Sequence, residues 1–441
     1  MNSFDVFSKG YTFLWRLARP FLQQHKRLHE NFSQRLVPTN WAEPATIWIQ
    51  SSSGGEAYLV RSLLEHFPIQ DSILHILLTT WTPQGRIILE ETKSMLESSR
   101  SDLSIQVQYV PLDEPALMEK ALIQVSPQLV VLIEAEIWPG LLFACNKRNI
   151  PVLVLNGRVK EKSLRGYDWF SWFFPEFWRA IAPKYVAAIS SADAARFTAL
   201  FGEYCVGVVP NIKFDRAICT LSQSDLSKNV LTELLPDKPI VLLASVREEE
   251  EALLVPVIKK LYSRYGKDIC IIVAPRHEFR VKEWVKKLNF VGINTQLRSI
   301  LTPYNEELYQ TDIPVIVWDT FGELDKLYNL ARAVFVGGSL APLGGQNFLE
   351  PLSVGKIPCV GKYLDNFSWV FEPLFDNVEH EDFSFFIRIC HTPFELIEQL
   401  EHQLQHPEPK EEIISRFNTW LESRKGGADK CVSLIMSMLE Q

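Results

Sequence analysis

One recurring unit constrains the fold of this chain most: a short apolar run, a polar loop that often contains glycine, and a stretch with helical periodicity. In the first half, the apolar runs are residues 47–49, 73–78, 129–133, 151–155 and 206–209. In the second half, they are residues 240–243, 269–273, 315–317, 333–336 and 357–360. Apolar runs that alternate with helices are typical of parallel strands covered on both faces. The repetition therefore predicts an α/β fold built from doubly wound parallel sheets.

The length of the chain predicts more than one domain. At 441 residues it exceeds what a single hydrophobic core normally holds, and its 47% hydrophobic residues are enough to fill two cores. Residues 220–237 are polar and read as a linker. We therefore predict an N-terminal segment (1–39), a first Rossmann-like domain (40–218) and a second Rossmann-like domain (219–441). The C-terminal helices of the second domain are free to pack back on the first.

Charge and cysteine content exclude several classes of function. The formal net charge of −8 does not suggest a protein that binds nucleic acid. The seven cysteines are scattered and form no C-x-x-C pair, which fits reduced thiols in a cytosolic compartment. No set of metal ligands is visible, so we predict neither a metal nor another cofactor.

Two aromatic stretches could contact lipid. Residues 7–22 mix aromatic and aliphatic side chains with Lys9, Arg16 and Arg19, a combination suited to a membrane interface. The alternative is a helix packed on the protein's own surface. Residues 167–178 are rich in Trp and Phe, which indicates either core packing or contact with an acyl chain or membrane.

Acidic residues follow two of the predicted strands. Glu56 lies in the loop after residues 47–49 and should occupy the first turn of a helix, at the edge where open α/β sheets bind ligands. The alternative is a carboxylate that only complements the helix dipole. Glu134 and Glu136 follow residues 129–133 and should reach the same edge, where repulsion between carboxylates would raise one pKa. They could instead be solvated loop acids.

Two further loops suggest an anionic ligand. Arg158, Lys160 and Lys162 follow residues 151–155 and suit an anionic substrate. Residues 336–350 contain two glycine pairs, at 337–338 and 344–345, which should adopt positive φ and admit a ligand against main-chain N–H groups. Residues 347–350 read as the first turn of a helix, whose N–H groups favour anions. Glycine pairs also serve ordinary turns.

Two Rossmann-like domains facing each other across a cleft are typical of the GT-B type of glycosyltransferase. The chain contains no D-x-D triplet, the acidic motif that holds a metal ion in the other major class. In a GT-B enzyme the second domain would bind a nucleotide-sugar donor, and the first would bind the acceptor and carry a base. Fold analogy alone does not name the substrates.

Eight motifs between about residues 40 and 370 resemble, in order, those of the 3-deoxy-D-manno-octulosonic acid (Kdo) transferase family, glycosyltransferase family 30. They are SGGEAY (53–58), TTWTPQGR (79–86), IEAEIWP (133–139), NGRVKEKS (156–163), NIKFD (211–215), APRHEF (274–279), WDTFGELDKLY (318–328) and VGGSLAPLGGQNFLEP (336–351). The resemblance implies transfer of Kdo from CMP-Kdo to a lipid A precursor, lipid IVA, in lipopolysaccharide synthesis. It also implies a place on the cytoplasmic side of the cell inner membrane, with residues 1–39 associating with that membrane.

The resemblance also implies roles for individual residues. Glu56 would be the general base, and Glu134 and Lys213 would stabilise the transition state of an inverting, metal-independent reaction. The predicted contacts to CMP are Pro275, Arg276, Phe321, Gly322, Glu323, Asn347, Phe348, Leu349 and Glu350.

The chain departs from the family pattern at two histidines. Arg247 stands in VREEEE where the family has a histidine, and Gln346 stands in GGQNF where it has another. These changes put any role of imidazole in doubt, although Glu56 and Lys213 are retained. The alternatives are another GT-B enzyme that uses a nucleotide sugar, such as a UDP-linked sugar or an epimerase substrate, and a non-catalytic protein that binds lipid A.

Overall fold

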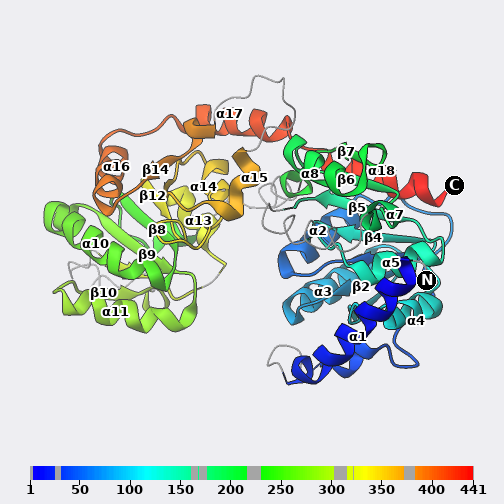
Figure 1. Ribbon diagram of the computed structural model, residues 1–441. Helices are drawn as coiled ribbons and strands as arrows, with labels where there is room; N and C mark the ends of the chain where they lie inside the picture. Colours follow the sequence, from blue (N-terminus) through cyan, green and yellow to red (C-terminus); the bar gives the residue numbers. More distant parts are fainter. Residues whose placement is uncertain are drawn as a thin grey trace. The chain divides into compact units, whose positions relative to one another are not determined.

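The computed structural model describes residues 3–24, 31–159, 167, 176–215, 230–301, 315–320, 322–371 and 383–440. The chain forms two compact units, each with its own parallel sheet (Figure 1). Unit 1 consists of Met1–Arg216, Pro373–Val378 and Arg424–Gln441, and unit 2 of Ala217–Glu372 and Glu379–Ser423.

Unit 1 is built on a sheet whose strand order is β3-β2-β1-β4-β5-β6-β7, with all neighbours parallel. The strands are β1 (Ile47–Gln50), β2 (Leu74–Thr80), β3 (Leu103–Tyr109), β4 (Leu129–Ile133), β5 (Val152–Gly157), β6 (Tyr185–Ala188) and β7 (Val206–Val208). The order reverses direction beside β1, which pairs with both β2 and β4. Ligands of open α/β sheets bind at such a point, outside the carboxyl ends of the strands.

Helices cover both faces of the unit 1 sheet. They are α2 (Gly54–Glu65), α3 (Pro83–Ser99), α4 (Pro115–Val125), α5 (Pro139–Lys147), α7 (Phe177–Ala180), α8 (Ser191–Phe201) and α18 (Gly427–Leu439). Along β1, Ile47 and Ile49 lie in the core beneath α2, α3 and α18, whereas Trp48 lies in the core beneath α4, α5 and α8. This alternation follows from the two-residue period of a strand.

The last helix of the chain, α18, packs in unit 1. Val432 and Ile435 lie in the same core as α2. The Asp215 carboxylate accepts hydrogen bonds from the backbone N–H groups of Gly426 (2.6 Å) and Ala428 (2.8 Å) at the start of α18. A carboxylate at a helix N-terminus satisfies donors that have no partner inside the helix.

Unit 2 has the strand order β10-β11-β9-β8-β12-β13-β14, again with all neighbours parallel. The strands are β8 (Ile240–Val246), β9 (Cys270–Pro275), β10 (Thr295–Leu297), β11 (Val315–Val317), β12 (Ala333–Val336), β13 (Cys359–Gly361) and β14 (Arg388–Cys390). The helices are α10 (Glu251–Tyr265), α11 (Val281–Phe290), α13 (Leu324–Leu330), α14 (Leu349–Ser353), α15 (Ser368–Phe371), α16 (Pro393–Gln405) and α17 (Lys410–Glu422). Two doubly wound parallel sheets confirm the predicted fold class.

The N-terminal helix α1 (Ser3–Gln23) packs on unit 1 with one face and exposes another. The Tyr11 hydroxyl donates to Asp113 (2.9 Å), and Arg19 forms an ion pair with Glu114 (2.5 Å). The large apolar side chains that α1 exposes are Phe13, Leu14, Leu17 and Phe21. Among the described residues, no helix is long and apolar enough to cross a membrane.

Most of the aromatic stretch at residues 167–178 lies outside the described part of the chain, as do Lys160 and Lys162. Phe177 and Trp178 are described, and both are buried in the core of unit 1. For these two rings, core packing is the observed role.

Candidate active site

Three glutamates meet at the carboxyl edge of the unit 1 sheet. Glu56 lies in the first turn of α2, directly after β1. Glu134 and Glu136 follow β4, and β4 is the parallel neighbour of β1. The topology therefore brings together acids that are about 80 positions apart in the sequence.

Glu56 is bonded to its own loop. Its carboxylate accepts hydrogen bonds from the backbone N–H of Ser52 (2.6 Å) and the hydroxyl of Ser53 (3.0 Å). The Ser53 side chain in turn accepts a hydrogen bond from the Glu56 N–H (3.4 Å) and so caps the start of α2. The structural role that we weighed against a functional one, complementing the start of the helix, is therefore present.

The electrostatics of Glu56 differ from those of an ordinary capping acid. Burial raises its pKa to about 8, and the charges of Glu136 and Glu134 add to this effect, whereas the bonds from Ser52 and Ser53 oppose it. A capping glutamate at the surface would instead have its carboxylate stabilised by the helix dipole. A strongly perturbed carboxyl at the ligand-binding edge of a sheet is a candidate functional group.

Lys213 forms an ion pair with Glu134, with 2.6 Å between Nζ and Oε1. Two asparagines fix the backbone that carries Lys213. Asn211 accepts a hydrogen bond from the Lys213 N–H (3.0 Å), and the buried Asn156 accepts one from the Ile212 N–H (2.9 Å). Glu134 itself has a left-handed φ of 57°, an uncommon backbone conformation for a residue other than glycine. The predicted residues Glu134 and Lys213 are thus in direct contact.

In unit 2, the loops after β8, β9 and β11 enclose a small pocket. Its lining residues are Ser245, Ala274, Pro275, Arg276, Trp318, Thr320, Gly322 and Leu324. Three predicted donor-binding residues, Pro275, Arg276 and Gly322, are therefore together, and Arg276 is exposed at the pocket. The predicted Phe321 lies outside the described residues.

Glu323 is already engaged by a cation. Its carboxylate accepts two hydrogen bonds from Arg298, at 3.1 Å from Nε and 3.0 Å from Nη2. The Arg298 guanidinium lies over the Trp318 ring at 5.3 Å. Glu323 is adjacent in the sequence to two residues that line the pocket, Gly322 and Leu324. Its partner Arg298 was not predicted, because no local pattern links residues 25 positions apart. Contact between Glu323 and CMP stays a prediction.

The glycine-rich loop after β12 differs from the prediction in two respects. The N–H groups of Gly338 (2.6 Å), Ser339 (3.0 Å) and Leu340 (2.9 Å) all donate to the carboxylate of Glu250, which is fully buried. An internal side chain therefore occupies main-chain donors that we expected a ligand to reach. Glu250 also accepts from the Arg247 N–H at 3.1 Å.

The expected positive φ is found at Gly338, Gly344 and Gly345, and the expectation for Gly337 is wrong. Gly337 is needed for space instead, because a Cβ there would lie 2.7 Å from the Ser245 carbonyl oxygen. The two glycine pairs thus shape the loop for different reasons.

The four predicted residues at 347–350 do not share one environment. Asn347 is exposed and donates from its side chain to Glu350 (2.8 Å). Phe348 is fully buried, and its ring contacts the rings of Phe367 and Phe383. Leu349 is also buried, and α14 begins there, two residues later than predicted. Asn347 and Glu350 are therefore the better candidates for contacts through side chains.

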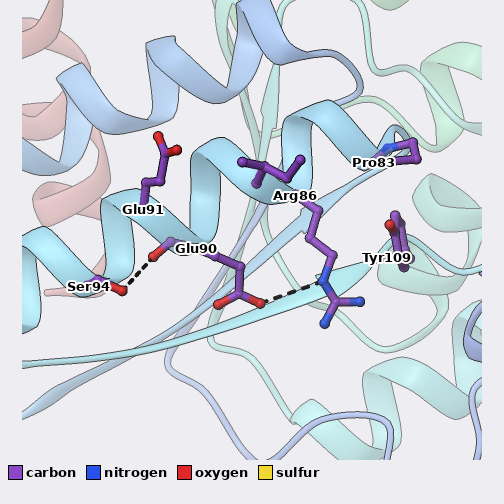
Figure 2. A pocket seen from close by; sticks show the side chains of 7 residues that line it. Pro83, Arg86, Glu90, Glu91, Ser94 and Tyr109 are labelled. Carbon is purple, nitrogen blue, oxygen red and sulfur yellow. Dashed lines mark hydrogen bonds and ion pairs between the residues drawn. The ribbon is translucent and has the colours of Figure 1, made fainter.

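A second hollow lies on unit 1, between α3 and the end of β3 (Figure 2). It is lined by Pro83, Arg86, Ile87, Glu90, Glu91, Ser94 and Tyr109. Arg86 forms an ion pair with Glu90 (3.6 Å) and donates to Gln34 (2.8 Å), and its guanidinium lies 4.9 Å from the centre of the Tyr109 ring. None of the predicted site residues lines this hollow.

Comparisons with known proteins connect these features to a family. Residues 26–216 match the family described as 3-deoxy-D-manno-octulosonic-acid transferase (kdotransferase). The chain is 29% identical over 411 residues to the 3-deoxy-D-manno-octulosonic acid transferase of Haemophilus influenzae, which covers 90% of this chain and 88% of that protein. It is also 29% identical to a bifunctional glycosyltransferase/methyltransferase of Fusobacterium nucleatum, covering 79% of this chain but only 52% of that protein. The chain thus spans about half the length of this second relative.

A solved structure shares the fold. The UDP-GlcNAc 2-epimerase from Neisseria meningitidis bound to UDP-GlcNAc aligns with 89% of this chain and 99% of its own, with a TM-score of 0.53 and 12% identity. At this identity the likeness concerns the fold alone. The fold serves an epimerase as well, so it does not decide the reaction.

Removing the Glu250 carboxylate should loosen the glycine-rich loop. Glu250→Ala leaves the N–H groups of Gly338, Ser339 and Leu340 buried without acceptors. Each unsatisfied group costs about 1–3 kcal/mol of stability. We expect the amide hydrogen exchange of these three residues to accelerate by at least tenfold. The matched control is Glu249→Ala, because Glu249 is half exposed and 3.9 Å from its nearest cation. Unchanged amide hydrogen exchange in Glu250→Ala would show that the Glu250 carboxylate does not hold the loop.

Proposed function

We propose that the chain is a member of the 3-deoxy-D-manno-octulosonic acid transferase family and that it transfers Kdo from CMP-Kdo to a lipid A precursor, lipid IVA. The observation that carries this proposal is the buried Glu56 carboxyl at the ligand-binding edge of unit 1, beside the Lys213–Glu134 ion pair. A carboxyl with a raised pKa suits removal of a proton from a hydroxyl, and a fixed ammonium suits a charge that develops during the reaction.

We propose that Glu56 acts as the general base. The acceptor hydroxyl transfers its proton to the Glu56 carboxylate as its oxygen bonds to the reacting carbon of Kdo. On the opposite face of that carbon, the bond to the phosphate oxygen breaks, and CMP leaves with the bonding electrons. A single displacement of this kind inverts the configuration and needs no metal ion.

Lys213 stabilises the negative charge that forms as CMP leaves. The ion pair with Glu134 and the backbone bonds to Asn211 and Asn156 hold its ammonium group in one place. A group that is fixed before the reaction does not have to reorganise during it, which makes its electrostatic contribution larger. Glu134 therefore acts on the transition state by holding Lys213.

The donor's nucleotide binds in unit 2. Arg276 supplies an exposed guanidinium beside the pocket that Pro275, Trp318 and Gly322 help to line. Arginine can bond a phosphate with two N–H groups at once. Asn347 and Glu350, together with Phe321 and Glu323, complete the proposed set of CMP contacts, with the backbone of Phe348 and Leu349. No other cofactor is proposed.

Helix α1 attaches the enzyme to the cytoplasmic face of the inner membrane. One side of α1 is fixed to unit 1 through Tyr11 and Arg19. The opposite side presents Phe13, Leu14, Leu17 and Phe21, with Arg16 exposed among them. Exposed rings and aliphatic groups beside a cation are the chemistry of an interfacial helix. This arrangement would bring the acceptor unit to the surface where its lipid substrate lies.

The sharpest test of the base is Glu56→Gln. This change keeps the size of the side chain and an oxygen that can accept the Ser52 hydrogen bond, but an amide cannot take up the acceptor's proton. We expect turnover to fall by about 10²-fold or more while CMP affinity is kept. Glu65→Gln, an exposed position at the end of the same helix, is the matched control and should leave turnover unchanged. Near-normal turnover in Glu56→Gln would show that Glu56 only caps the helix and is not the base.

The donor site is tested by nucleotide binding. CMP should protect the protein from thermal unfolding and UDP should not, which separates this proposal from an enzyme that uses a UDP-linked sugar. Arg276→Ala should weaken CMP binding at least tenfold, because a cation beside the phosphate is lost. Lys260→Ala, at an exposed position of the same unit, serves as the control. A change in CMP affinity below about twofold in Arg276→Ala would contradict the assignment.

Membrane binding by α1 is tested with vesicles that contain anionic lipid. Replacing Phe13, Leu17 and Phe21 with Ser should release most of the protein from the vesicles, since each ring or aliphatic group contributes apolar area. The control replaces Ile69, Ile73 and Ile123, which are equally exposed elsewhere on unit 1, with Ser. Equal sedimentation of the two triple variants with vesicles would rule out α1 as the attachment site.

A further inference from the structure

Glu136 has no part in the mechanism above, yet it is the most buried of the three glutamates at the site. Its side chain follows β4 and the residue is 9% exposed. Its Oε2 accepts a hydrogen bond from the Trp138 indole N–H at 2.6 Å and lies 3.5 Å from the Gln50 side-chain nitrogen. A carboxyl group is rarely buried without a reason, because loss of hydration disfavours its charged form.

The indole that binds Glu136 is itself fixed. The Trp138 ring stacks on the Trp81 ring, with 5.6 Å between centroids and 21° between planes. The guanidinium of Arg35 lies 4.3 Å from the centre of the Trp81 ring, and Arg35 is buried and bonded to the Val110 carbonyl (3.1 Å). Stacking of this kind limits the orientations of Trp138. Glu136 is therefore held in place from a distance by a packed layer.

The end of β1 links Glu136 to Glu56. The Gln50 side chain donates to the Glu136 carboxylate at 3.5 Å, and two residues later the backbone N–H of Ser52 donates to the Glu56 carboxylate at 2.6 Å. Both carboxyl groups therefore lie at the end of β1, and the charge of Glu136 acts on Glu56. Burial raises the pKa of Glu136, and the hydrogen bonds from Trp138 and Gln50 oppose this effect by stabilising its charged form. In that form Glu136 faces Glu56 as a like charge.

Other charged groups lie near this pair. Glu134 also acts on Glu56 and Glu136, but its charge is matched by Lys213 at 2.6 Å. Asp113 and Tyr167 also interact electrostatically with Glu136. Asp113 is bonded to the N–H groups of Gly140 and Leu141, and to the Tyr11 hydroxyl, so its position is independent of Glu56.

We propose that Glu136 is a positioning residue which acts through Glu56: held by Trp138 and Gln50, its negative charge makes Glu56 a stronger base than an isolated glutamate. The inference rests on the proposed role of Glu56 and extends it. A stronger base takes a proton from a hydroxyl more readily, at the expense of being protonated at a higher pH. The buried position of Glu136 is therefore explained by its effect on Glu56.

The test is the pH dependence of kcat/KM for Kdo transfer in wild type and in Glu136→Gln. The base must be deprotonated, so the wild-type rate should rise with pH through a midpoint near 8, the raised pKa of Glu56. Glu136→Gln keeps an acceptor for the Trp138 N–H but removes the charge. We expect the midpoint to move down by roughly one pH unit and the plateau at high pH to fall roughly threefold. The variant should therefore be relatively more active than wild type at low pH and less active at high pH.

If the pH profiles of kcat/KM cross, Glu136 changes the pKa of Glu56. Structural damage would instead lower kcat/KM at every pH. Glu119→Gln removes a carboxylate that pairs with Lys147 on the surface of the same unit, and should leave the profile unchanged. Trp138→Phe removes the indole N–H together with part of the ring that stacks on Trp81, and should move the midpoint in the same direction by a smaller amount. It provides a second route if Glu136→Gln folds poorly. An unshifted midpoint in either folded variant overturns the proposal.

A direct titration separates this inference from the proposed function. In protein labelled with ¹³C at the glutamate carboxyl carbons, the Glu56 signal is assigned by its absence in Glu56→Gln. Its midpoint is then followed by NMR, which requires no substrate. A Glu56 midpoint that falls in Glu136→Gln supports the inference even if the protein transfers no Kdo. A midpoint that stays near the wild-type value contradicts it even if Glu56 proves to be the base.

Discussion

Burial of the Glu56 carboxyl beside two other carboxylates is the constraint on which the unit 1 site depends. Like charges at close range are tolerated here because each has a separate means of stabilisation. Glu134 pairs with Lys213, Glu136 accepts a hydrogen bond from Trp138, and Glu56 is bonded to Ser52 and Ser53. Glu56 receives its hydrogen bonds from neutral groups, which offset its loss of hydration only in part, so its pKa is raised. Burial also raises the pKa of Glu136, and that of Asp113 to about 7, while the pKa of Glu56 reaches about 8.

In unit 2, a buried carboxylate has a structural role and not a proposed catalytic one. Glu250 takes up main-chain N–H groups of the glycine-rich loop and fixes the loop as part of the scaffold. The chemistry in this unit is then left to side chains at neighbouring strand ends, among them Arg276 beside the pocket. Both units follow one rule, which is that loops at the carboxyl ends of parallel strands hold functional groups while buried polar contacts shape those loops.

The sequence carries the fold largely through its apolar runs, and each of the ten predicted runs overlaps a strand. Strands without such a run were missed. In β3, buried Leu103, Ile105 and Val107 alternate with partly exposed residues, as expected for an edge strand, and β10 and β14 span three residues each. These strands lack a continuous apolar run, although the two-residue alternation in β3 is itself typical of a strand with one buried face.

The site was predictable to the extent that it follows from local position and motif. Glu56 could be placed in the first turn of a helix because a glycine loop separates it from a strand. The contacts of Glu250 and the pairing of Arg298 with Glu323 could not be predicted, since they join residues 25 to 90 positions apart through tertiary packing alone. Phe348 shows the converse, because a residue inside a ligand-like motif has its ring in the core.

The central claim is that this chain transfers Kdo to a lipid A precursor, and one measurement addresses it directly. The purified full-length protein is incubated with CMP-Kdo and a tetraacylated lipid A precursor, and the lipid product is weighed by mass spectrometry. The account predicts that the lipid gains the mass of one or more whole Kdo residues, with release of an equal number of CMP molecules. A lipid of unchanged mass, recovered with intact CMP-Kdo from protein that is folded and binds CMP, would contradict it.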